Sequence, residues 1–159
     1  MLGVVLALGY PFSNQTVSLI GFSLGCQVIK SCLKTLHKLG ANDIIQNVSL
    51  LGGATHFTTD IPLWERIFSL TVAGKVKNSY SKKDSVLALY FICQKHEAVG
   101  RHLIMGDSKN NLKGSADREE DVVVTERDFF KLKNYMNIHG HMDYKRKLAE
   151  IVSGLKIEE

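Results

Sequence analysis

Residues 17–33, VSLIGFSLGCQVIKSCL, contain the pattern G-x-S-x-G as Gly21-Phe22-Ser23-Leu24-Gly25. Residues 16–22 carry no charge and are mostly apolar, which is typical of a short buried strand. After Leu24 the apolar residues recur at steps of three and four, which predicts a helix that stops at Gly40. We therefore expect Ser23 on a sharp turn from a strand into a helix, as in a nucleophile elbow.

Such a turn is strained, and it lifts the serine hydroxyl clear of the sheet above the helix N-terminus. Side chains at Gly21 and Gly25 are expected to collide with neighbouring backbone, so both positions call for glycine. The Leu24 N–H, unpaired at the first helical turn, is predicted to be one oxyanion donor. The alternative is a structural glycine-serine turn without chemistry.

Strands and helices alternate along the rest of the chain. Strands are predicted over residues 44–51, 75–80 and 121–125, and helices over residues 64–72, 85–95 and 142–155. This alternation predicts an α/β fold with a mostly parallel sheet and helices on both faces. Residues 1–159 are expected to form a single domain, in which the Gly-, Ser- and Asn-rich residues 106–121 form a polar surface insertion.

Ser23, Asp84 and His141 each follow a predicted strand. Because parallel strands end at a common edge, these residues are expected to meet there. A serine hydroxyl needs a base, usually histidine, and a carboxylate orients the imidazole. Their order along the chain is the one typical of this elbow. We predict Ser23 as the nucleophile, His141 as the general base and acid, and Asp84 as the orienting carboxylate.

Other residues of the same chemical types compete for these roles. Asp84 could instead cap the helix that begins at Ser85. His139 and His141 could form a metal pair, but no third ligand has a recognisable spacing, so neither a metal nor a cofactor is predicted. The remaining candidates are His56, Asp60, Asp107, Asp117 and Asp121.

Composition narrows the class of protein. With 159 residues and 45% hydrophobic content, one domain with a core is expected. The net charge of +4 comes from scattered lysines, so nucleic-acid binding is not predicted. Three cysteines without a C-x-x-C pattern predict buried reduced thiols and an intracellular location. No segment is long enough to span a bilayer.

Four blocks occur in the order VSLIGFSLGCQVIKSCL, VSLLGGATH, VAGKVKNSYSKKDSVL and GHMDYKRKL. Together they resemble the α/β-hydrolase-like domain of the transmembrane and coiled-coil domain-containing protein 4 family, formerly a domain of unknown function. The resemblance places the serine of that family on Ser23, its aspartate on Asp84 and its histidine on His141. It implies hydrolysis of a small-molecule ester or a lipid.

The resemblance also implies that the chain matches the C-terminal half of a hydrolase fold. The elbow strand would then be a sheet edge, which the missing N-terminal half or a partner would cover. Membrane association on the cytoplasmic side would come from segments absent here. Because the second oxyanion donor usually precedes the elbow, this chain alone is expected to be a weak catalyst.

Two other functions stay open. The chain could be a non-catalytic hydrolase-like scaffold for membrane-trafficking or protein contacts, for which the apolar helix after Asp84 would serve. Ordinary packing of that helix against the sheet is the preferred expectation. A flavodoxin-like domain with a phosphate at Gly52-Gly53 is the third possibility.

Overall fold

The computed structural model describes residues 1–10, 15–57, 59–96, 98–102, 104, 125–127, 132–136 and 140–154. Within these ranges the strands form a single sheet in the order β1-β2-β3-β5-β4. The strands are β1 (Val17–Phe22), β2 (Ile45–Leu51), β3 (Val76–Tyr80), β4 (Thr125–Arg127) and β5 (Leu132–Met136). Neighbouring strands run parallel from β1 to β5, and β4 pairs antiparallel with β5.

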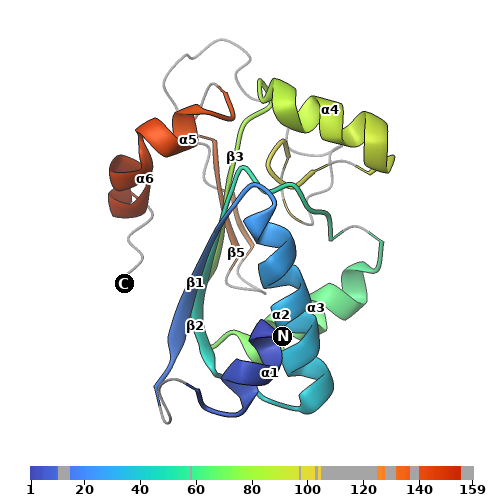
Figure 1. The fold of residues 1–159 in the computed structure, drawn as a ribbon, viewed down its shortest axis with the longest axis vertical. Coiled ribbons are helices and arrows are strands. Elements are labelled where there is room, and N and C mark those ends of the chain that lie inside the picture. The colour runs from blue at the N-terminus through green and yellow to red at the C-terminus, as the bar shows by residue number, and fades with distance from the viewer. Residues whose placement is uncertain are drawn as a thin grey trace.

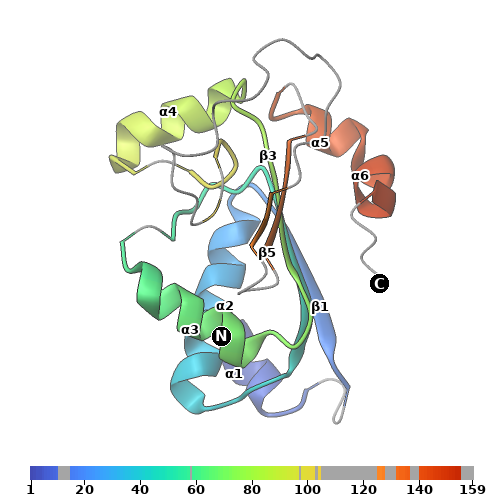
Figure 2. The same cartoon turned by 180° about the vertical axis from the view of Figure 1, so that it is seen from behind.

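Helices cover both faces of this sheet (Figures 1 and 2). They are α1 (Leu2–Ala7), α2 (Gly25–Leu39), α3 (Ile61–Thr71), α4 (Ser85–Gln94), α5 (Asp143–Arg146) and α6 (Leu148–Gly154). The first three lie on one face and the last two on the other, whereas α4 stands beyond the end of β3. The predicted α/β fold with a mostly parallel sheet is therefore confirmed.

The main core lies between α2, α3 and the sheet. It joins one face of α2 to the inward side chains of β2 and to the aromatic face of α3. A smaller cluster of Leu51, Tyr144 and Ile151, with Phe22 against it, lies under α5 and α6 on the opposite face. Members of the main core include Ile29, Leu33, Leu36, Ile45, Val48, Leu50, Trp64, Ile67 and Phe68.

Two predicted elements near the C-terminus differ from the structure. The strand that pairs in parallel with β3 is β5, whereas the sequence placed the fourth parallel strand at residues 121–125. Residues 121–124 lie outside the described ranges, and Thr125 begins the antiparallel β4. Lys133 and Asn134 interrupt the apolar pattern of β5, so the pattern did not reveal it. The single helix predicted from Met142 is divided into α5 and α6 at Lys147.

Strand β1 lies at the edge of the sheet formed by the described strands, as the resemblance implies. Among the described strands it pairs only with β2. The prediction of a buried strand over residues 16–22 is wrong about its burial, because Ile20 is 48% exposed and Gly21 alone among the residues of β1 is buried. On α2, which follows it, Val28 and Leu39 also lie outside the buried face.

The turn between β1 and α2 is strained at Ser23, whose φ is 52°. Hydrogen bonds on both sides hold it in this conformation. The Ser23 N–H donates to the Leu51 carbonyl at 3.0 Å, and the Ser23 carbonyl accepts from the Ala54 and Cys26 N–H groups at 3.0 and 3.1 Å. The second strand and its loop therefore fix the backbone of this serine.

The two glycines around Ser23 have different surroundings. A Cβ at Gly21 would lie 2.7 Å from Ile29 Cδ1, at the end of a flexible side chain, and 3.2 Å from the backbone nitrogen of Cys26. Glycine at this position therefore allows the close approach of α2 to β1, and a larger residue would require both to shift. A Cβ at Gly25 would meet nothing within 4 Å. The expectation that both positions need glycine for space is therefore right for Gly21 and wrong for Gly25.

The cysteines also differ in their surroundings. Cys26 and Cys32 are buried, whereas Cys93 on α4 is exposed, so the prediction of three buried thiols is wrong for Cys93. All three thiols are free, as predicted. The Cys26 thiol donates to the Gly21 carbonyl at 3.2 Å, and burial raises the pKa of Cys26 to about 12.

Gly21→Ala is expected to lower the free energy of unfolding by about 1–3 kcal/mol, because the new methyl group overpacks the contact between β1 and α2. Gly25→Ala is the matched control. It places a methyl group in open space at the first residue of a helix, where alanine is favoured over glycine by up to about 1 kcal/mol. Urea unfolding followed by circular dichroism measures both variants, and equal destabilisation would contradict this packing.

The cysteine surroundings predict selective alkylation. At pH 8, iodoacetamide is expected to modify Cys93 at least about a hundredfold faster than Cys26, because the thiolate is the reactive form and a raised pKa suppresses it. Mass spectrometry of peptides from a time course measures the two rates. Denaturation in urea should bring them together, and similar rates in the native protein would contradict the burial of Cys26.

Candidate functional site

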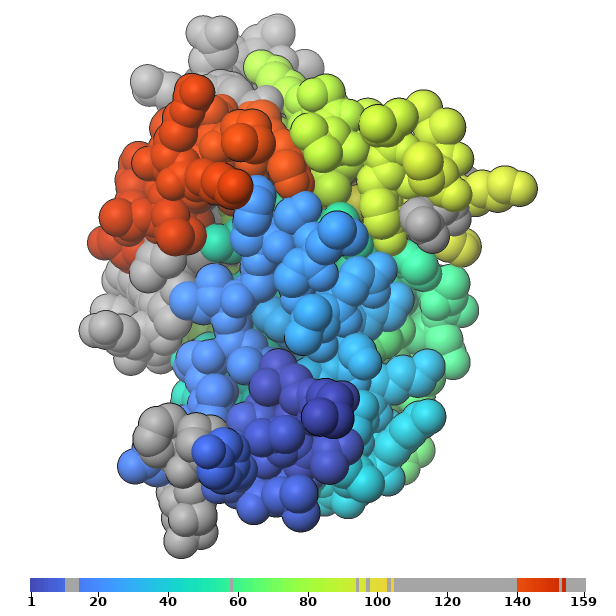
Figure 3. Space-filling view, in the orientation of Figure 1, coloured from blue at the N-terminus to red at the C-terminus, as the bar shows by residue number. Residues whose placement is uncertain are grey.

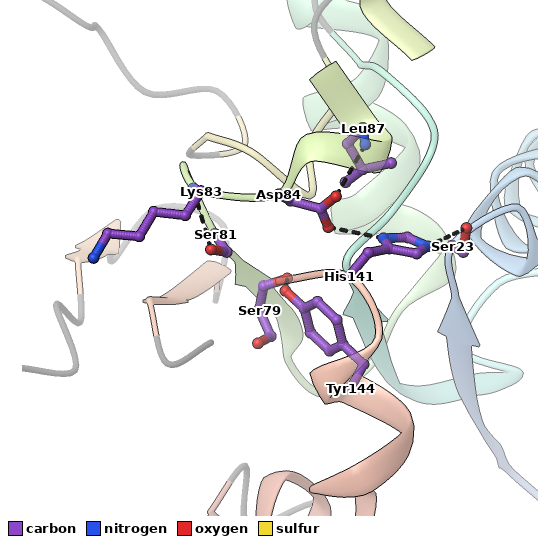
Figure 4. A network of polar contacts seen from close by, with 8 residues as sticks. All are labelled: Ser23, Ser79, Ser81, Lys83, Asp84, Leu87, His141 and Tyr144. Carbon is purple, nitrogen blue, oxygen red and sulfur yellow. Dashed lines mark hydrogen bonds and ion pairs between the residues drawn. The ribbon is translucent and has the colours of Figure 1, made fainter. Parts of the chain in front are cut away.

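Three polar side chains meet beyond the carboxyl ends of the parallel strands (Figure 4). Ser23 follows β1, Asp84 follows β3, and His141 lies between β5 and α5. Ser23 Oγ lies 2.9 Å from His141 Nε2, and His141 Nδ1 lies 2.8 Å from Asp84 Oδ2. The structure thus brings together the three residues that the sequence singled out, although up to 118 positions separate them in the chain.

Asp84 has two contacts, one through each carboxylate oxygen. Oδ1 accepts the Leu87 N–H at 2.9 Å and so caps α4, while Oδ2 faces the imidazole of His141. The side chain is fully buried. Helix capping and orientation of the histidine were alternative interpretations of this residue, and the structure contains both contacts. The helix N-terminus also favours the negative charge there.

These contacts define the hydrogen-bond directions at His141. A carboxylate only accepts, so His141 Nδ1 carries the proton that Asp84 binds. In a neutral imidazole with this tautomer, His141 Nε2 is the acceptor and faces the Ser23 hydroxyl, which donates to it. An imidazole arranged in this way can take a proton from the serine, which is the chemistry of a general base.

Aromatic side chains hold His141 in place. Its ring centroid lies 4.9 Å from that of Phe22 and 6.4 Å from that of Tyr144. The Tyr144 hydroxyl donates to the Ser79 carbonyl at 3.0 Å, which fixes the start of α5 to β3. Burial raises the pKa of Tyr144 well above its usual value, so the phenol stays protonated as a donor.

The sequence analysis did not predict the supporting contact of Tyr144 with the site. The signal that could have shown it is the spacing His141-x-x-Tyr144, which puts both side chains near the start of one helix. Phe22 was missed because G-x-S-x-G specifies no residue at its second position.

The loops after β2 and β3 pack against other parts of the chain. Gly52, with a φ of 50°, lies against Tyr144, whose Cε2 would be 2.6 Å from a Cβ at that position. The Gly100 N–H donates to the Gly53 carbonyl at 3.0 Å, and the Ser81 N–H donates to the Gly100 carbonyl at 2.8 Å. Since both glycines pack against protein atoms, the geometry does not favour a phosphate at Gly52-Gly53.

Leu24, whose N–H the sequence predicts as an oxyanion donor, is the N-cap residue of α2. Within the described ranges, no hydrogen bond that links turns, loops and helix caps has this N–H as its donor. The group lies directly after Ser23, so it is placed where an acceptor on a bound molecule could use it. Its part in catalysis stays a prediction.

The other candidate residues take part in separate contacts. Asp60 caps α3 by accepting the Leu63 N–H at 3.1 Å. His56 stacks on His96 with ring centroids 4.3 Å apart, and burial, Lys30 and His96 lower the pKa of His56. No group of three potential ligands that could hold a metal occurs among the described residues. His139, Asp107, Asp117 and Asp121 lie outside them.

Comparison with known proteins gives several relatives. "Uncharacterized membrane protein F35D11.3" of Caenorhabditis elegans is 31% identical over 149 residues, which are 91% of this chain and 21% of that protein. "Probable lipase MIL1" of Saccharomyces cerevisiae is 30% identical over 144 residues, 90% of this chain and 12% of that protein. "Transmembrane and coiled-coil domain-containing protein STS1" of Oryza sativa is 38% identical over 92 residues, 57% of this chain and 13% of that protein.

The chain thus spans about a fifth or less of the length of these relatives. No solved structure matches it. The model of one protein family matches residues 12–158, nearly the whole chain. The chain therefore belongs to the family described as "Protein of unknown function (DUF726)".

Proposed function

We propose that this chain carries the nucleophile, general base and orienting carboxylate of a serine hydrolase that acts on esters, with lipids as the substrate class. The observation that carries the proposal is the continuous hydrogen-bond chain from Ser23 through His141 to Asp84. A non-catalytic scaffold is less well supported, because it gives no reason for a 2.8 Å contact between Asp84 and His141 beside a serine with a strained backbone.

In the proposed reaction, Ser23 Oγ attacks the carbonyl carbon of the ester while His141 Nε2 accepts the hydroxyl proton. The imidazolium that forms is stabilised by the buried Asp84 carboxylate. When the tetrahedral intermediate collapses, the ester C–O bond breaks and His141 returns the proton to the departing alcohol. The acyl group then remains on Ser23.

Hydrolysis of this acyl-serine repeats the sequence with water. His141 Nε2 takes a proton from the water as its oxygen attacks the acyl carbon. Collapse of the second intermediate breaks the bond to Ser23 Oγ, which regains its proton from His141. The carboxylic acid leaves, and the starting protonation states of all three residues are restored.

The Leu24 N–H is the proposed donor to the oxygen that becomes negative in each intermediate. A second donor in such elbows comes from a loop earlier in the fold. We propose that another part of the full-length protein, or a partner, covers the open edge of β1 and supplies it. Loss of one donor costs about a hundred- to a thousandfold in turnover, so this chain alone is expected to hydrolyse esters slowly.

The names of the relatives support the proposed substrate class and location. The yeast relative is named a probable lipase, which supports a lipid ester as the substrate. The worm and rice relatives are named as membrane or transmembrane proteins. These names support kinship with the transmembrane and coiled-coil domain-containing protein 4 family and attachment of the full-length protein to a membrane, with this domain on the cytoplasmic side.

A fluorophosphonate probe, which reacts with activated serines, is expected to label Ser23 of the folded chain. Ser23→Ala should abolish labelling, and His141→Gln should slow it by about a thousandfold or more because the general base is lost. Ser18→Ala, at an exposed serine of β1, is the matched control and should label normally. Intact-mass and peptide mass spectrometry measure the extent and the position of labelling. A folded wild-type chain that is never labelled would contradict the proposal.

Asp84→Asn separates the two contacts of this residue. The amide oxygen of asparagine can still cap α4, whereas its NH2 group facing His141 Nδ1 imposes the wrong tautomer. Labelling is expected to slow by on the order of 10³–10⁴-fold, while the free energy of unfolding changes by less than about 1 kcal/mol.

Asp84→Ala removes both contacts and should also lower stability by about 1–2 kcal/mol. Fluorophosphonate labelling quenched at a series of times measures the labelling rate of each variant. Urea unfolding measures its free energy of unfolding. Labelling of Asp84→Asn at the wild-type rate would show that the contact with His141 has no catalytic part.

A further inference from the structure

Helix α4 is apolar on nearly all sides, yet it is only partly packed. Leu87 is 1% exposed and packs with Ala54 and Ala98. The outer side chains Val86, Leu89, Phe91 and Ile92 are 50%, 61%, 44% and 71% exposed. The expectation that this helix packs ordinarily against the sheet is therefore wrong for its outer face. A helix that is hydrophobic all round is normally buried, so this face calls for an occupant.

The charges around the helix indicate which occupant fits. Lys82 and Lys83 precede α4 and Lys95 follows it, and all three are exposed. Between Lys82 and His96 the only acidic residue is Asp84, which is fully buried. An apolar face with exposed lysines at both ends is complementary to an anionic lipid surface, in which acyl chains meet the side chains and headgroups meet the lysines, although Glu97 follows His96 in the sequence.

The length of α4 defines how it could meet such a surface. Ten residues of helix extend about 15 Å, half the hydrocarbon thickness of a bilayer. No helix in the described part of the chain is both long and apolar enough to cross a membrane. Helix α4 would therefore lie in the plane of the interface, with its outer face in the headgroup region.

The apolar face adjoins the candidate site. Asp84 is the N-cap of α4, and the Gln27 amide on α2 donates to the Tyr90 hydroxyl on α4 at 3.2 Å. Leu24, directly after Ser23, is 65% exposed. In the space-filling view, α4 lies beside the start of α2 and projects from the upper end of the molecule (Figure 3). A surface that binds α4 would therefore lie near the turn that carries Ser23.

We propose that α4 is an interfacial docking helix, which binds an anionic lipid surface through Val86, Leu89 and Ile92 and the lysines at its ends, and so presents the site to lipid. The purpose of this docking, which is to bring lipid to the site, rests on the proposed function. The binding itself needs no catalysis, so the two can be tested separately.

The test measures binding of the purified chain to vesicles of phosphatidylcholine alone and of phosphatidylcholine with about one third phosphatidylserine. Sedimentation of the vesicles gives the bound fraction. Binding is expected to be strong only with phosphatidylserine. It should weaken at least about tenfold in Leu89→Ser/Ile92→Ser and on the order of a hundredfold in Lys82→Gln/Lys83→Gln/Lys95→Gln at low salt.

Matched controls change equally exposed residues elsewhere on the chain. Leu8→Ser/Leu39→Ser and Lys34→Gln/Lys38→Gln/Lys145→Gln should bind like the wild type, and circular dichroism should show that every variant is folded. Equal losses in the control variants, or no binding to either vesicle, would overturn the proposal.

Self-association of the chain that Leu89→Ser/Ile92→Ser abolishes, seen by sedimentation velocity without vesicles, would show that the face is an interface between copies and would also overturn it. Fluorophosphonate labelling of Ser23 in the same samples reports the proposed function independently. Normal labelling without vesicle binding would reject the docking helix alone, and binding without labelling would reject the hydrolase alone.

Discussion

The contact between His141 and Asp84 is the interaction on which the arrangement of the site depends. It joins the segment after β3 to the segment after β5, and it is made by a carboxylate that also caps α4. The buried Asp84 side chain therefore contacts both the first turn of α4 and the imidazole of His141, which lies in the loop after β5. Without it, nothing in the described site would select the tautomer of His141 that accepts from Ser23.

The rest of the site keeps the contact between His141 and Asp84 aligned with Ser23. Hydrogen bonds from the second strand and its loop hold Ser23 at a positive φ, and the absence of a side chain at Gly21 lets α2 pack beneath it. On the other side of His141, Tyr144 anchors α5 to β3 through the Ser79 carbonyl. Strain at one residue persists because the surrounding packing and hydrogen bonds over-determine it.

The parts of this arrangement that sequence could predict are local or carried by a motif. The strand, turn and helix around Ser23 are contiguous, so the change in apolar spacing revealed them. Asp84 was found because parallel strands end at one edge and because the block around it resembles a known family. His141 was found mainly through that resemblance, because it follows β5 and not the parallel strand predicted at residues 121–125. The fold class followed from the same alternation of strands and helices.

What the sequence missed depends on contacts between distant segments. β5 carries lysine and asparagine, and its place beside β3 comes from pairing rather than from an apolar pattern. Gly100 lies between the Gly52-Gly53 backbone and Leu87, a close approach that no local signal shows. The same holds for the open space at Gly25 and for the exposed outer face of α4. The spacing of apolar residues does not show which distant segments pack against them.

The tautomer of His141 tests the central claim most directly. Nitrogen-15 NMR of the chain labelled at histidine, with the resonances assigned through His141→Gln, distinguishes a proton on Nδ1 from a proton on Nε2. The account predicts that neutral His141 carries its proton on Nδ1, coupled to the Asp84 carboxylate, with Nε2 unprotonated toward Ser23. A neutral imidazole protonated on Nε2, or one that exchanges freely between the two forms, would contradict it.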